Sequence, residues 1–104
     1  MLIEFCDPNL NTNNNRRTPL HLAAKYGHID TVKLLIEEGA LINKTDLLGR
    51  TPLHLAAKYG YIDTVKLLIE KGAHMKMDWV WMKPLHLATK ANFNEVAQFL
   101  RNAC

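Results

Sequence analysis

Residues 18–27 read TPLHLAAKYG, and the same ten residues return unchanged as residues 51–60. The stretch IDTVKLLIE follows both copies, first as residues 29–37 and again as residues 62–70. A third, altered copy of the first motif, KPLHLATK, occupies residues 83–90. Repetition at a spacing of 33 residues, with one residue fewer before the third copy, indicates that one supersecondary unit is stacked several times along the chain.

Turn and cap residues predict two short helices in each unit. Thr18 stands where a helix N-cap is expected, and Pro19 stands at the first helical position, where a missing N–H costs nothing. Gly27 ends this helix, because a residue with positive φ is favoured there. The second helix ends at Gly39, and its apolar residues recur at helical spacing. The predicted buried face of the second helix consists of Ile29, Val32, Leu35 and Ile36.

A 33-residue period with a Thr-Pro-Leu-His-x-Ala core resembles the ankyrin repeat. The resemblance covers residues 16–104 and implies an all-α solenoid of helix-turn-helix repeats with projecting β-turn fingers, forming one domain over residues 1–104. The segment Asp46–Arg50 is predicted to form the turn of one finger. We divide the chain into a remnant of a preceding repeat with its finger and three repeats, at residues 1–15, 16–48, 49–80 and 81–104.

The two ends of the array differ in sequence. Asn94 and Arg101 replace Ile62 and Ile69 of the preceding repeat, and a polar outer stripe is what a terminal capping repeat requires. At the other end, residues 1–5 match only the end of a second helix, so we interpret them as a truncated or abbreviated start. The first full repeat would then be poorly covered, which leaves a homodimer through this N-terminal face as a possibility. The residues expected to be uncovered are Leu20, Leu22, Ile29 and Ile36.

The composition favours a soluble intracellular protein. The chain of 104 residues is 48% hydrophobic and 22% charged, which is typical of one globular domain. No apolar run reaches the about 18 residues of a membrane span, and residues 1–5 lack the length and basic lead of a signal peptide. Cys6 and Cys104 lie at opposite ends of the predicted stack, too far apart for a disulfide. We therefore expect reduced thiols and a location in the cytoplasm or nucleus.

Residues suited to catalysis are scarce. The chain has no serine, and its five glycines stand alone at repeat boundaries, so no phosphate-binding loop is present. His21, His54 and His86 recur once per repeat, but a repeat spacing of about 10 Å separates their rings too widely for a shared metal ion. The resemblance implies instead that these histidines tie the finger backbone of one repeat to the next. We predict no enzymatic activity, cofactor, metal or small-molecule substrate.

The charges separate between two sides of the predicted stack. The fingers and first helices carry nine basic and three acidic residues, whereas the second helices and their ends carry four basic and seven acidic residues. In proteins that resemble this one, the finger and first-helix side is a concave groove that binds partners. Lys25, Lys58 and Lys90 would form a ladder along it, and a basic face favours an acidic partner. The alternative is a row of lysines that is merely solvated.

The finger before the third repeat departs from the pattern. Trp81 replaces the turn glycine Gly49, and Lys83 replaces the capping Thr51. Residues 79–82 read WVWM and would make, with Leu47 and Leu48, an apolar strip of the kind that marks contact sites. Alternatively, the two indoles fold down and seal the last repeat.

We predict a non-catalytic module that binds an acidic protein partner through its basic concave face and finger tips. One alternative is electrostatic nucleic-acid binding, suggested by an isoelectric point of about 9.0. A second is self-association as a structural segment of a longer array. The contact residues implied by the variable surface positions of the family are Arg17, Lys25, Tyr26, Leu47, Leu48, Arg50, Lys58, Tyr59, Trp79, Trp81, Met82 and Lys90.

Overall fold

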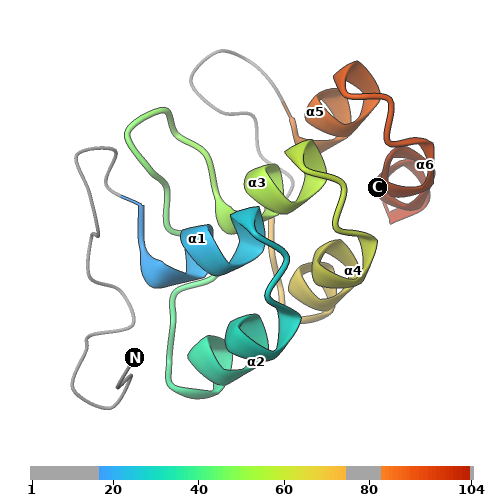
Figure 1. Ribbon diagram of the computed structural model, residues 1–104. Coiled ribbons are helices and arrows are strands. Elements are labelled where there is room, and N and C mark those ends of the chain that lie inside the picture. Colours follow the sequence, from blue (N-terminus) through green and yellow to red (C-terminus); the bar gives the residue numbers. More distant parts are fainter. Residues whose placement is uncertain (1–16, 75–82, 104) are drawn as a thin grey trace.

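The computed structural model describes residues 17–74 and 83–103, and this part of the chain contains helices and no strand (Figure 1). The predicted all-α fold is confirmed. The short helix predicted before Cys6, the Trp79–Trp81 finger and both cysteines lie outside the described residues. The helices are α1 (Pro19–Lys25), α2 (Ile29–Glu37), α3 (Pro52–Lys58), α4 (Ile62–Glu70), α5 (Pro84–Lys90) and α6 (Asn94–Ala103).

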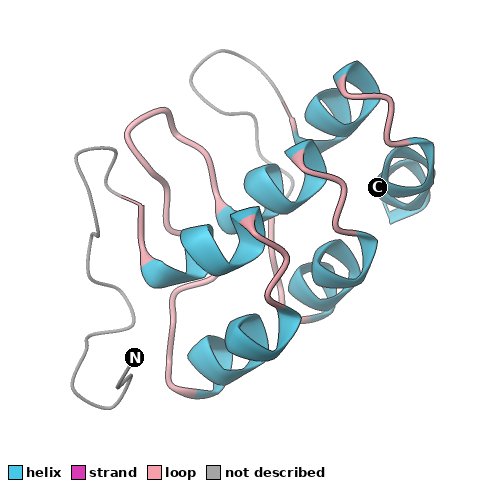
Figure 2. Cartoon of the chain, in the orientation of Figure 1, coloured by secondary structure: helices cyan, strands magenta, loops and turns pink. Residues whose placement is uncertain are grey.

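The helices form two layers (Figure 1). The first helices of the repeats, α1, α3 and α5, pack side by side, and α4 of the second layer packs against both α2 and α6. Each first helix also packs on the second helix of its own repeat. Figure 2 shows the long loop that leaves α2, projects as a finger and returns to α3. This arrangement is a solenoid in which every pair of helices relies on its neighbours for burial.

The first helices start with a reciprocal cap between a threonine and a histidine. Thr18 accepts a hydrogen bond from the His21 backbone N–H at 3.4 Å, and the Thr18 N–H donates to His21 Nδ1 at 3.1 Å. Thr51 repeats both bonds at the start of α3. At the start of α5, the Lys83 side chain has no acceptor for the His86 backbone N–H, so that bond is lost. The other bond remains, because the Lys83 backbone N–H donates to His86 Nδ1 at 3.1 Å. Helix α5 therefore begins as predicted despite the loss of the threonine.

Gly27 and Gly60 end the first helices for two physical reasons. Their φ values of 70° and 79° lie in the left-handed region that favours glycine. An aromatic ring of the following repeat also covers each glycine. A Cβ at Gly27 would lie 2.5 Å from the Tyr61 ring, and a Cβ at Gly60 would lie 2.6 Å from the Phe93 ring. A larger residue at either position would therefore require the ring or the backbone to shift.

The core lies between the two layers and runs through all three repeats. Val32 and Leu35 of α2 are buried as predicted, but Ile29 and Ile36 are only half-buried. The prediction of a fully buried stripe was wrong because the second helices form the outer layer, where the edges of the apolar face meet solvent. The core residues with no exposed surface include Leu20, Ala24, Val32, Leu53, Ala56, Ala57, Val65, Leu68, Ala88 and Leu100.

The C-terminal end of the stack has the exposed polar stripe that was predicted, whereas the N-terminal end is covered more completely at Leu20 than predicted. Asn94 and Arg101 are exposed on α6, as expected for a polar outer stripe. Leu20 was expected to be uncovered at the N-terminal face, and this is wrong, because Leu20 belongs to the buried cluster that joins the two layers. Leu22 is half-buried. Ile29 and Ile36 are half-buried as well, so of the four residues expected to be uncovered only Leu20 is fully buried.

Candidate interaction surface

His21 has a structural role that joins two repeats. Its Nδ1 accepts the Thr18 backbone N–H, so the proton of the neutral ring is on Nε2. Nε2 then donates to the backbone carbonyl of Arg50, in the next finger, at 2.8 Å. Burial lowers the pKa of His21, against the opposing effects of the Arg50 carbonyl and the Asp46 charge. The predicted tie between histidine and finger is confirmed for this residue.

The finger that leads to α3 is fixed by one buried carboxylate. Asp46 Oδ1 accepts the backbone N–H groups of Leu48 and Arg50, both at 2.9 Å. Its Oδ2 pairs with Arg17 Nε at 3.2 Å, and the two side chains are only 1% and 12% exposed. Sequence reasoning missed this ion pair, which attaches the finger to the start of α1. The predicted contact residue Arg17 thus offers little free surface.

The tip of this finger is apolar. Leu47 and Leu48 are 43% and 46% exposed, as expected for a tip that projects from the stack. Arg50, at the base, is half-buried. Trp79, Trp81 and Met82, predicted to extend this apolar strip, lie outside the described residues. The described part of the strip therefore consists of the two leucines.

Lysines and tyrosines alternate along the C-terminal ends of α1 and α3. Lys25 Nζ lies 5.2 Å from the centre of the Tyr26 ring and 5.9 Å from the centre of the Tyr59 ring. Lys58 Nζ lies 5.5 Å from the centre of the same Tyr59 ring. All three distances are in the range of cation–π attraction. We call these four residues the Lys–Tyr ladder. The predicted row of lysines is therefore interleaved with rings, an arrangement that the repeated Lys-Tyr pair of the sequence could have suggested.

The third repeat continues the charge of the ladder without its rings. Lys90 is exposed at the end of α5, and Ala91 follows where the other repeats have tyrosine. Within the described residues, none of Lys25, Lys58 and Lys90 forms an ion pair with a carboxylate. In the same ranges, fingers and first helices carry seven basic residues and one acidic residue, and the second helices together with the residues that follow them carry four basic and six acidic residues. Counted over the described residues, the fingers and first helices thus keep their excess of basic residues.

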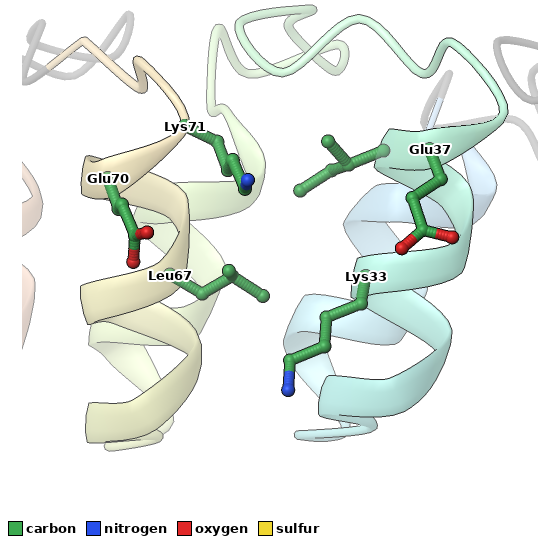
Figure 3. A pocket seen from close by; sticks show the side chains of 6 residues that line it. Lys33, Glu37, Leu67, Glu70 and Lys71 are labelled. Carbon is green, nitrogen blue, oxygen red and sulfur yellow. The ribbon is translucent and has the colours of Figure 1, made fainter.

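A hollow on the outer layer offers a contrasting surface (Figure 3). It lies between α2 and α4, has a volume of about 340 Å³, and is floored by Ile36 and Leu67. In Figure 3, Leu67 points from α4 toward α2, with Lys33 and Glu37 on the opposite helix. Both signs of charge surround the hollow, so its electrostatics select neither an anion nor a cation.

The described residues contain neither a metal-binding cluster nor a membrane-spanning helix. No group of three His, Cys, Asp or Glu side chains is arranged there to hold a metal ion. In the same part of the chain, no helix is long and apolar enough to cross a membrane.

Comparison with known proteins agrees with the repeat pattern. The family model for ankyrin repeats (3 copies) matches residues 1–79 and residues 48–104. The human protein histone-lysine N-methyltransferase EHMT1 is 43% identical to this chain over 44 residues, or 41% of the chain. The chain spans about 3% of the length of that protein, so the similarity concerns a short part of it.

Proposed function

Because the chain belongs to the ankyrin repeat family, we propose that it is a non-catalytic module that binds an acidic protein partner through its basic face and finger tips. Ankyrin repeats generally serve as protein–protein interaction modules, and the family is typically non-catalytic. The observation that carries the acidic partner is the Lys–Tyr ladder, which presents ammonium groups that no described carboxylate neutralises. Lys90 adds a third cation in line with it.

Electrostatics and apolar contact have separate roles in this proposal. A face with an excess of one charge attracts an oppositely charged partner over several ångströms and speeds its association. Exposed apolar side chains then contribute area that is buried in the complex. Leu47 and Leu48 at the finger tip provide this contact. The proposed contact residues within the described part are Lys25, Tyr26, Leu47, Leu48, Lys58, Tyr59 and Lys90.

A titration with a fluorescent polyglutamate peptide tests the proposal. The anisotropy of the peptide should rise as protein is added, and the apparent affinity should fall as salt is raised. The double variant K25E/K58E should lose binding. The matched control is K33E/K66E, which changes the net charge equally but lies on the outer helices. If the two variants lose binding to the same degree, only net charge matters and the assignment to this face is wrong.

Single-stranded nucleic acid is the second candidate partner, and one observation favours it. The ladder alternates cations with exposed rings, and such a surface suits a phosphate backbone with stacked bases. Labelled oligothymidylate in the same titration measures this alternative. Tighter binding of oligothymidylate than of polyglutamate, lost in both K25E/K58E and Tyr59→Leu, would replace the protein partner with nucleic acid.

A further inference from the structure

The ladder has a spacing that restricts the backbone of a bound chain. Lys25 Nζ and Lys58 Nζ lie 5.9 and 5.5 Å from the same Tyr59 ring centre, so the two nitrogens are at most 11.4 Å apart, the total of these two distances. The helices that carry them, α1 and α3, pack directly against each other. Packed helices have axes about 8–10 Å apart. A regular backbone that lies across both helices would match them best with carboxylates about 8–10 Å apart on one face.

Few regular backbones meet this condition. An extended β-strand places side chains on one face about 6.7 Å or 13 Å apart, on either side of this helix spacing. A polyproline II helix has three residues per turn and a rise of 3.1 Å, so every third side chain lies on one face about 9.3 Å from the last. An α-helix meets the spacing only at every seventh residue, about 10.5 Å along its axis.

The rings of the ladder favour the polyproline II solution. Tyr26 and Tyr59 are 56% and 39% exposed, and each lies within 6 Å of a lysine Nζ. Aromatic surfaces of this kind receive the prolines of polyproline II segments. Each lysine lies beside a tyrosine ring, so a residue next to each carboxylate can contact that ring. Proline satisfies this contact and also keeps the segment in the required conformation.

We propose that the Lys–Tyr ladder binds an acidic polyproline II segment that has Asp or Glu at every third residue with proline between them. Successive carboxylates pair with Lys25, Lys58 and Lys90, and prolines lie on Tyr26 and Tyr59. This inference rests on the proposed function and specifies the partner of the same site. At the third repeat, where Ala91 replaces the tyrosine, the segment gains only an ionic contact.

Three labelled peptides of equal charge test the spacing. The first repeats Glu-Pro-Ala, the second has the same composition with shuffled glutamates, and the third is an alanine-rich helix with glutamate at every seventh residue. We expect the regular peptide to bind about tenfold more tightly than the other two, because its charges engage several lysines at once. Tyr59→Leu should remove most of this preference, and Lys58→Glu should abolish binding. Phe99→Leu is the matched control, because Phe99 lies 5.7 Å from Lys66 Nζ on the outer layer and should not matter.

Each result decides between this inference and the function on which it rests. If regular and shuffled peptides bind equally, and Lys58→Glu weakens both, the spacing is wrong and the acidic partner stands. If the helical peptide binds most tightly, the polyproline II conformation is wrong. If none of the acidic peptides binds, both proposals are wrong. Tyr26→Leu provides a second ring variant, and thermal melts followed by circular dichroism show that each variant is folded.

Discussion

Replacing Gly60 with alanine should strongly destabilise the protein, because this glycine lies where two repeats meet. Its φ of 79° is left-handed, and alanine in that region costs about 1–2 kcal/mol. The new Cβ would also lie 2.6 Å from the Phe93 ring, and overpacking of this kind costs about 1–3 kcal/mol. We expect the free energy of unfolding to fall by about 2–5 kcal/mol, a large part of the stability of a small domain.

A double-mutant cycle separates the two contributions. In the background of Phe93→Ala the added methyl group meets no ring, so Gly60→Ala should cost only the backbone part, about 1–2 kcal/mol. Urea unfolding of the four proteins, followed by far-UV circular dichroism, gives the coupling energy, which we expect at about 1–3 kcal/mol. Gly72→Ala is the control for backbone cost, because φ is 101° there and no atom of the described residues lies within 4 Å of the added Cβ.

Equal costs of Gly60→Ala in the two backgrounds would refute this reasoning. The Phe93 ring would then not restrict the position, and the register of the repeats would depend on other contacts. The result also bears on binding, because Tyr59 directly precedes Gly60. A shift of the third repeat at this point would move one ring of the Lys–Tyr ladder.

Three further changes test the structural account. Burial lowers the pKa of His21 below 6.5, so the unfolded chain takes up the proton first as the pH falls. The stability that this residue contributes above pH 6.5 is therefore lost as the pH falls toward the pKa of the folded state. His21→Gln should reduce this loss, as measured by urea midpoints on either side of pH 6.5. Leu68→Ala should cost about 2–5 kcal/mol and Leu100→Ala less, because α4 packs against helices on both sides and α6 does not; equal costs in urea melts would contradict the capping assignment. Asp46→Ala should cost about 3–5 kcal/mol by breaking the buried ion pair with Arg17, and Asp46→Asn should cost less because it keeps an acceptor for the finger N–H groups; thermal melts would show the order.

The helices could be predicted nearly to the residue because their signals are local. Thr18, Pro19 and Gly27 fix the start and end of α1 within one stretch of chain, and an identical stretch gives α3. The half-burial of Ile29 could not be predicted from periodicity, because a helical stripe does not show how wide the covered face is. That width depends on the layer to which the helix belongs, which only the packing of the whole stack determines.

The surface was harder to predict because its contacts join separate repeats. Arg17 and Asp46 are 29 residues apart and meet only when the finger folds back on α1. Lys25 meets Tyr59 for the same reason, through the packing of α1 on α3. Charge counting assigned more basic residues to the fingers and first helices, but it treated each lysine separately and so missed the alternation with tyrosine.

A map of the binding face in solution tests the central claim most directly. Amide chemical shifts of isotope-labelled protein would be followed while the regular acidic peptide is added. We expect the largest changes in residues 22–27 and 55–60, which end α1 and α3, with smaller changes in residues 88–91. Changes concentrated instead on the outer helices, around Lys33 and Lys66, would contradict the assignment of the basic first-helix face as the partner-binding surface.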